Sequence, residues 1–137
     1  MSFKDFIKEG KVRKSSQDKM MAKSIISNTL EDLKFLEQTK LTELSKRKLV
    51  SNYYDSLRSL LEAISLIKGY KIYSHEAFTY FLKEELRQEI LSLKFDRFRK
   101  IRNGLNYYGK SIQLREAEDI IKELKSVIKE VKQKFIK

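Results

Sequence analysis

The sequence predicts an all-α protein, folded as an up-and-down bundle of four or five helices. Two observations carry this prediction. The 137-residue chain has no proline and only four glycines, so few residues would interrupt a helix. Apolar residues also recur every three to four positions in four long segments, the spacing that gives a helix one apolar face. Short links between such helices favour antiparallel neighbours.

The apolar spacing and its interruptions predict where each helix begins and ends. A short N-terminal helix is expected within residues 1–14, and the main bundle in the rest of a single domain covering 1–137. Gly69 is expected to end one helix in the left-handed conformation, Ser74 to cap the start of the next, and Gly109 to end that one. The main helices are expected at 15–37, 42–68, 75–103, with a break near 87–92, and 111–136.

The composition indicates the cell compartment and the kind of partner. Thirty lysines and arginines against 19 acidic residues give a net charge of +11, which favours a polyanionic partner, although a solvated lysine-rich surface would give the same balance. The absence of cysteine suits a reducing cytoplasm. No stretch approaches the roughly 18 apolar residues of a membrane span, and the first 14 residues are charged. We therefore expect an unprocessed cytoplasmic protein without a membrane partner.

Isolated titratable residues predict neither a metal site nor a cofactor. The only histidine, His75, has no cysteine or second histidine with which to bind a metal, so a surface or capping role is expected for it. Glu84, Glu85 and Glu89 are typical of a solvated helix face. The chain also contains no phosphate-binding loop and no nucleophile elbow.

Positive charge is concentrated in residues 87–115. This basic segment has a net charge of +6, more than half of the total, in about a fifth of the chain. Its two acidic residues are Glu89 and Asp96. Its cationic residues are Arg87, Lys94, Arg97, Arg99, Lys100, Arg102, Lys110 and Arg115.

Within this segment, "FDRFRKIRNGLNYYG" (95–109) predicts a binding surface for RNA or a nucleotide. Helical spacing places Phe95, Phe98, Ile101 and Leu105 on one face, with Arg102 at the edge of the core. A guanidinium held there suits phosphate oxygens, and tyrosine rings can stack on bases. Alternatively, Arg102 pairs with a glutamate of a neighbouring helix and the tyrosines fill the bundle end. The residues expected to bind RNA or a nucleotide are Arg97, Arg99, Arg102, Asn106, Tyr108 and Lys110.

Two stretches, "SLLEAISLIKGYKIYSHEAFTYFLKEEL" (59–86) and "FDRFRKIRNGLNYYGK" (95–110), together resemble the HEPN domain family. The likeness runs from about residue 15 to the C-terminus, and "RNGLNYYG" carries most of it. The resemblance implies a helical bundle that dimerises so that an arginine motif from each subunit lines a shared cleft. It also implies metal-independent endoribonuclease activity on an R-x(4–6)-H motif, and a toxin role opposite a nucleotidyltransferase antitoxin.

The resemblance carries over to three residues, which would be the catalytic ones in an active protein. Arg102 matches the motif arginine, Asn103 matches the polar residue after it, and Tyr107 stands where the family has histidine. A phenol titrates near pH 10 and an imidazole near 6.5, so tyrosine is the poorer base at neutral pH. Weak or absent cleavage is therefore expected.

Three functions remain open from the sequence: RNA cleavage, RNA or nucleotide binding without turnover, and docking of a nucleotidyltransferase without RNA binding. The missing motif histidine favours the second and third, and the basic segment favours the first two. A homodimer is also expected, from the resemblance and because Tyr53, Tyr54, Phe95 and Tyr108 offer more aromatic surface than one bundle easily covers.

Overall fold

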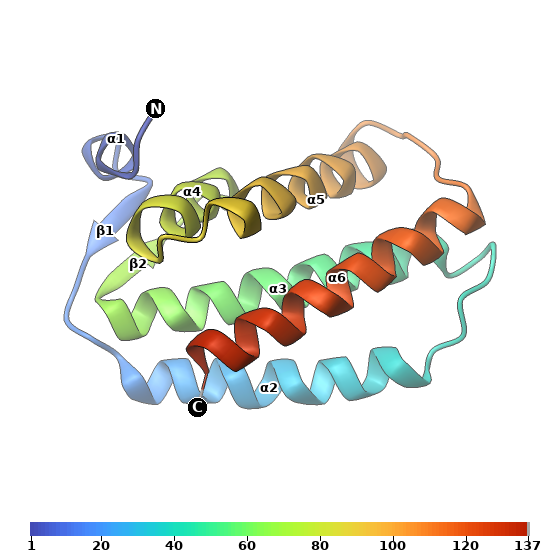
Figure 1. The fold of residues 1–137 in the computed structure, drawn as a ribbon, viewed down its shortest axis with the longest axis horizontal. Coiled ribbons are helices and arrows are strands. Elements are labelled where there is room, and N and C mark those ends of the chain that lie inside the picture. The colour runs from blue at the N-terminus through green and yellow to red at the C-terminus, as the bar shows by residue number, and fades with distance from the viewer. Residues whose placement is uncertain (137) are drawn as a thin grey trace.

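The computed structural model describes residues 1–136 and confirms an all-α helical bundle, with one very small sheet added (Figure 1). Among these residues, no helix is both long and apolar enough to cross a membrane. The elements, in chain order, are α1 (Phe3–Lys8), β1 (Val12–Lys14), α2 (Lys19–Gln38), α3 (Lys46–Lys68), β2 (Tyr70–Ile72), α4 (His75–Tyr80), the π-helical turn η1 (Phe81–Glu85), α5 (Glu89–Tyr107) and α6 (Leu114–Phe135).

Helix α3 is the centre of the bundle. In Figure 1 it lies between α2 on one side and α4 and α5 on the other, with α6 crossing in front of it. Thirteen of its 23 residues are buried, and three of these are serines, because helices pack against it from several sides. One α3 side chain, Tyr53, lines a hollow between α2 and α6.

Helix α2 is an edge helix that packs mainly on α3. Only Ala22, Thr29 and Leu36 of its 20 residues are buried. Helix α6 also packs on α3, through a single apolar stripe of seven buried residues, and makes few direct contacts with α2. The two outer helices therefore leave part of the apolar interior uncovered between them.

The N-terminal segment differs from its prediction, because residues 12–14 form a strand rather than part of a helix. β1 pairs antiparallel with β2, with Val12 opposite Ile72. Three-residue strands are too short to show the alternation by which a strand is recognised in a sequence. Helix α1 belongs to the core, since Phe3 and Phe6 are both buried and the Phe3 ring packs edge-on against Tyr70 at 5.1 Å.

The predicted helix ends at the middle of the chain are confirmed. Gly69 ends α3 with φ 88°, and a Cβ there would lie only 2.9 Å from the Ser15 carbonyl oxygen, so both the backbone angle and the space favour glycine. Ser74 precedes α4 at the expected position, although its side chain makes no capping hydrogen bond. The expected break near 87–92 occurs at Arg87, whose φ of 55° separates the π-helical turn from α5.

The aromatic argument for a dimer is wrong for three of its four residues. Tyr53, Tyr54 and Phe95 are buried within a single chain, against α3, α5 and their neighbours. Only Tyr108 is exposed, to 74%. The homodimer stays a prediction that rests on the family resemblance.

Candidate functional site

An open hollow of about 340 Å³ lies where the start of α4 meets the C-terminal half of α5. Four of the residues singled out from the sequence, all on α5, line it together with three residues from the start of α4. We call it the Arg102 hollow. Its lining residues are Ser74, His75, Glu76, Arg99, Arg102, Asn103 and Tyr107.

The Arg102 side chain is held in place from several sides. It is 13% exposed, and its guanidinium carbon lies 5.6 Å from the centre of the Tyr54 ring and 5.2 Å from that of Tyr107. One terminal nitrogen donates to the Tyr107 hydroxyl at 3.0 Å, and the other lies 3.5 Å from an Asp55 carboxylate oxygen on α3. Its Nε–H is buried without an acceptor. The guanidinium is therefore oriented, and its hydrogen-bonding capacity is only partly used.

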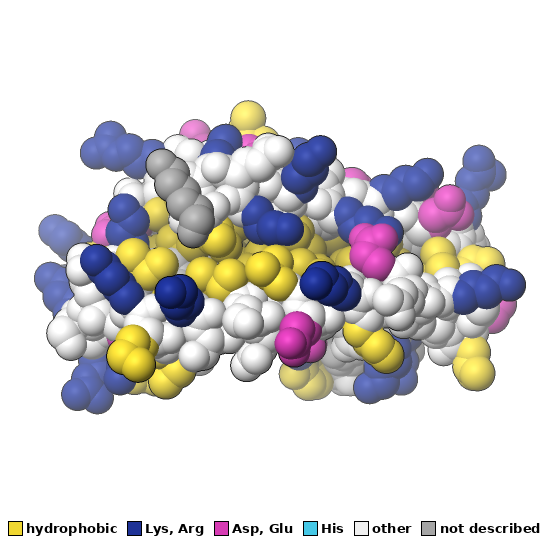
Figure 2. All heavy atoms as spheres, turned by 90° about the horizontal axis from the view of Figure 1, so that it is seen from below, with side chains coloured by type: hydrophobic (Ala, Val, Ile, Leu, Met, Phe, Trp, Pro, Cys, Tyr) yellow, Lys and Arg dark blue, Asp and Glu magenta, His cyan; other side chains and the backbone are white. Residues whose placement is uncertain are grey.

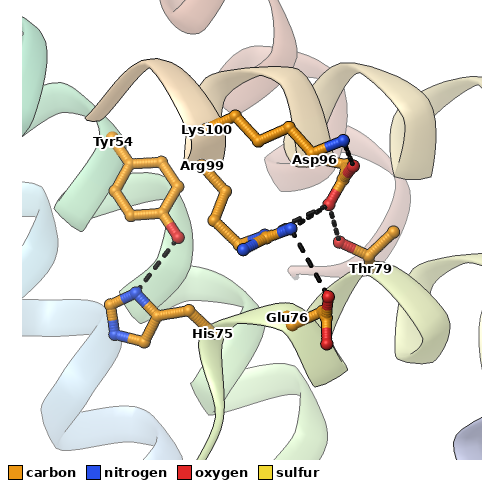
Figure 3. Close-up of polar contacts among 7 residues, drawn as sticks. All are labelled: Tyr54, His75, Glu76, Thr79, Asp96, Arg99 and Lys100. Atoms are coloured by element: carbon orange, nitrogen blue, oxygen red, sulfur yellow. Dashed lines mark hydrogen bonds and ion pairs between the residues drawn. The ribbon is translucent and has the colours of Figure 1, made fainter. Parts of the chain in front are cut away.

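Arg99 is bound more tightly to carboxylates than Arg102 is. Figure 3 shows the contacts of Arg99 with Asp96 and Glu76. The Nε and a terminal nitrogen of Arg99 both donate to Asp96 Oδ1, at 3.1 and 2.8 Å, and Glu76 lies 3.7 Å away. The Asp96 carboxylate also pairs with the Lys100 ammonium at 3.1 Å and accepts a hydrogen bond from the Thr79 hydroxyl at 3.3 Å. Burial opposes ionisation of Asp96, yet the hydrogen bonds from Arg99 and Lys100 outweigh it and hold the Asp96 pKa below its usual value.

His75 enters the hollow from the first residue of α4, and its contacts there differ from the surface or capping role expected for it. Its Nδ1 lies 3.2 Å from the hydroxyl of Tyr54, as Figure 3 shows. Burial raises the pKa of Tyr54, so this hydroxyl stays protonated and can donate to Nδ1, which would leave the imidazole proton on Nε2. Burial, and then the charges of Arg58, Arg102 and Arg99, lower the pKa of His75 to about 4. The imidazole is therefore neutral at pH 7.

Carboxylates from other elements pair with three of the eight cations in the basic segment. Arg97 pairs with Glu123 of α6, Arg99 with Glu76 of α4 as well as Asp96, and Arg102 with Asp55 of α3. The alternative left open by the sequence was that Arg102 pairs with a glutamate of a neighbouring helix. Its partner is on a neighbouring helix but is an aspartate, Asp55 of α3. Tyr107 and Tyr108 are 65% and 74% exposed and do not fill the bundle end. An anion entering the hollow must displace a carboxylate or share a guanidinium with one.

The remaining predicted binding residues lie away from the Arg102 hollow. Arg97 and Lys110 line a separate hollow of about 570 Å³ between α5 and α6, together with Glu116, Asp119 and Glu123. Asn106 accepts a hydrogen bond from Ser51 of α3 at 2.9 Å, and Tyr108 points to solvent. The predicted surface is therefore divided between different sides of α5.

The acidic residues before α5 have structural contacts. Glu84 accepts a hydrogen bond from the backbone N–H of Phe3 at 3.1 Å, and Glu85 accepts one from the Tyr70 hydroxyl at 2.9 Å. The two carboxylates therefore hold α1 and β2 against η1. Within residues 1–136, no group of three or more histidine, cysteine or acidic side chains is placed to hold a metal ion.

Comparison with protein-family models, with curated proteins and with solved structures finds no match to this chain. The Arg102 hollow itself therefore carries the functional argument. It combines two arginines, a neutral histidine, an asparagine and an exposed tyrosine within a space large enough for a phosphate group.

Proposed function

We propose that the Arg102 hollow binds a phosphate group of RNA or of a nucleotide, and that the chain is a HEPN-like RNA-binding protein. The observation that carries the proposal is the state of Arg102, which is oriented by packing, has an unused buried donor, and faces a hollow shared with His75 and Asn103. Planar guanidinium groups bind phosphate through parallel hydrogen bonds, and a preorganised guanidinium loses little side-chain entropy on doing so.

The neighbouring residues supply the rest of a nucleotide site. The Asp55 oxygen lies 3.5 Å from Arg102, longer than a good charged hydrogen bond, so a phosphate oxygen can compete for this guanidinium. Partial burial raises the pKa of Asp55 in spite of the opposing charges of Arg102 and Arg58. The exposed ring of Tyr107 offers a stacking face for a base, and the Asn103 amide offers both a donor and an acceptor.

Metal-independent RNA cleavage is a second candidate function, and His75 is the observation that favours it. A neutral imidazole beside Arg102 can accept the proton of a 2′-hydroxyl while the guanidinium stabilises charge on the attacked phosphate. A pKa of about 4 makes this base weak, although a bound phosphate would offset the arginine charges and raise it. We therefore expect slow cleavage at most. A toxin role and a nucleotidyltransferase partner rest on the family resemblance alone.

Binding of a labelled single-stranded RNA, followed by fluorescence anisotropy at low salt, tests the proposal. Arg102→Ala should weaken binding about tenfold or more, because a hydrogen bond to a charged group contributes about 1.5–3 kcal/mol. Arg115→Ala is the matched control: it removes the same charge from the same basic segment, at an exposed position outside the hollow. It should change affinity less than twofold at moderate salt.

The salt dependence provides an independent check on the size of the site. With Arg99 and Arg102 as the phosphate contacts, the slope of log K against log salt should be about −1.4, since each phosphate neutralised on a single strand contributes about −0.7. Equal losses for Arg102→Ala and Arg115→Ala would contradict a specific site and indicate general attraction to a basic protein.

A further inference from the structure

A second surface feature lies on the opposite side of α3, between α2 and α6. Figure 2 shows a band of hydrophobic side chains running along this face, with lysine or arginine side chains on both sides of it. The band includes a hollow of about 430 Å³, which we call the lysine-rimmed groove. Its lining residues are Leu30, Leu33, Lys34, Glu37, Tyr53, Lys125, Ile128, Lys129 and Lys132.

The groove is apolar at its floor because α2 and α6 pack on α3 and scarcely touch one another. Tyr53 of α3 and Ile128 of α6 form its deepest part, being only 2% and 4% exposed. Leu30 and Leu33 line the α2 side and are only half-buried. If another element covered the groove, both leucines would bury more of their apolar surface away from water, which is favourable.

The rim of the groove is strongly basic. Four lysines surround it, and the only acidic lining residue, Glu37, lies 3.5 Å from Lys125. The Lys125 ammonium also lies 5.5 Å from the centre of the Tyr53 ring. Among the described residues, Lys34, Lys129 and Lys132 have no carboxylate within 4 Å. These lysines stand on both helices, so an incoming segment would meet positive charge on each flank.

The dimensions of the groove suit a helix of about four turns. A smaller hollow of about 170 Å³ continues it, sharing Glu37, Tyr53 and Lys125. It extends to Ile121 and adds a second carboxylate, Glu118, which lies 3.7 Å from Lys122. Along α6 the combined lining extends from Glu118 to Lys132, a rise of about 21 Å at 1.5 Å per residue. An amphipathic helix laid into a groove between two helices is a common mode of peptide recognition.

We propose that the lysine-rimmed groove binds an acidic amphipathic helix of a partner protein. Apolar residues of the partner at three- and four-residue spacing would cover Leu30, Leu33 and Ile128, and flanking carboxylates would meet Lys34 on α2 and Lys129 on α6. A second copy of this chain fits less well, because it would bring the same row of lysines to the interface. The inference does not depend on RNA binding at the Arg102 hollow.

Two synthetic peptides test the charge and the place of binding together. The probe is a 16-residue helical peptide with a leucine stripe and glutamates on both flanks, and its control has lysine at every glutamate position. Each is titrated into the full ¹⁵N-labelled chain. The acidic peptide should bind at least tenfold more tightly than the basic one, and its amide shifts should fall on α2, α6 and the middle of α3.

Matched double variants then test the rim itself. Lys129→Glu with Lys132→Glu should weaken the acidic peptide about tenfold, since it replaces attraction on one flank by repulsion. Lys71→Glu with Lys83→Glu makes the same change in net charge at two exposed positions outside the groove, and should leave affinity within twofold. Circular dichroism of both variants verifies that the fold is intact.

Several results would overturn the proposal. These are equal affinity for the two peptides, shifts outside the groove, or equal effects of the two double variants. Displacement of the acidic peptide by single-stranded RNA, with RNA shifting the groove amides, would assign the groove to nucleic acid. Sedimentation that shows self-association lost in the Lys129→Glu, Lys132→Glu variant would assign it to a second copy.

Discussion

The Arg102 hollow and the lysine-rimmed groove, on opposite sides of α3, differ in how their charges are balanced. In the hollow, Arg99 and Arg102 each have a carboxylate within 4 Å. In the groove, three of the four lysines have none among the described residues. Four of the eight cations concentrated along the basic segment thus have a carboxylate partner in space, whereas lysines scattered over two helices combine into a rim. The net charge of +11 says little about where a partner binds.

The two surfaces also differ in what supports them. Behind the hollow stands Tyr54, which is fully buried and stacks on Phe95 at 5.4 Å between ring centres. The groove is lined on one side by Leu30 and Leu33, which are half-buried on an edge helix. A preorganised site suits recognition of a compact charged group, and a shallow apolar site suits a ligand that brings its own apolar surface.

The largest expected effect concerns the stability contributed by the side chains that support the two surfaces. Tyr54→Ala should lower the free energy of unfolding by about 3–5 kcal/mol, as large-to-small changes of buried aromatic residues do. Leu33→Ala should lower it by about 1 kcal/mol, because much of this side chain already contacts water. Urea denaturation followed by circular dichroism measures both. A Leu33→Ala cost as large as that of Tyr54→Ala would mean that the groove is as well packed as the core.

The next effect concerns chemistry, since only the hollow contains a histidine. If the protein cleaves RNA there, cleavage should persist in EDTA and leave a cyclic phosphate. Arg102→Ala should then slow it by about 10²–10³, a loss of about 2.7–4 kcal/mol in transition-state stabilisation. His75→Ala should slow it comparably, as loss of a general base does. A labelled RNA incubated with each variant and with the Arg115→Ala control gives the rates.

A further variant separates the two residues that could move the proton. Tyr107→Phe keeps the ring of Tyr107 and removes only its hydroxyl, so cleavage that depends on His75 should change little. Cleavage that survives His75→Ala and disappears in Tyr107→Phe would transfer the proton-moving role to the tyrosine that stands at the motif position.

The smallest expected effect is the response of stability to acid. The pKa of His75 is about 4 in the folded chain and about 6.5 when unfolded, so the unfolded state takes up the proton first as pH falls. The stability that neutral His75 provides is therefore complete above pH 6.5 and is lost as pH falls toward 4. Since the side chain is half-buried, we expect an effect of about 1 kcal/mol.

Comparison of variants isolates this effect from the titration of carboxylates. Between pH 7 and pH 4.5, His75→Gln should lose about 1 kcal/mol less unfolding free energy than the unmodified chain, while Lys129→Gln in the groove should lose the same amount as the unmodified chain. Denaturation at the two pH values provides the measurement. An identical loss in the histidine variant would show that the imidazole is protonated as easily in the folded chain as in the unfolded one.

Features set by neighbouring residues could be predicted from the sequence. The end of α3 at Gly69 depends on a local backbone angle, and the burial of Phe95, Phe98 and Leu105 follows from spacing within one helix. Of the four hollow residues on α5, Arg99 and Arg102 came from charge and spacing within this helix, and Asn103 and Tyr107 came from the family resemblance. The break near Arg87 was also predicted.

Features that depend on packing between distant segments could not be predicted. His75 meets Arg102 only because α4 packs against α5, and periodicity within one helix carries no information on that contact. The carboxylates that pair with the basic segment come from α3, α4 and α6 for the same reason. The one available signal for His75 was its place just after Ser74, at the start of a helix, which fixes its position along the chain and not its neighbours.

The small sheet has a consequence for how the chain acquires its structure during synthesis. Pairing of Lys14 with Tyr70 closes a loop of 56 residues, and the length-dependent part of the loop-closure entropy costs about 3.6 kcal/mol. Lys14 and the residues before it must therefore wait for partners made later, for roughly 3–12 s at ordinary elongation rates of about 5–20 residues per second. In that interval Phe3 and Phe6 have no core to enter. These two aromatic side chains are thus exposed to water and to chaperones until β2 emerges.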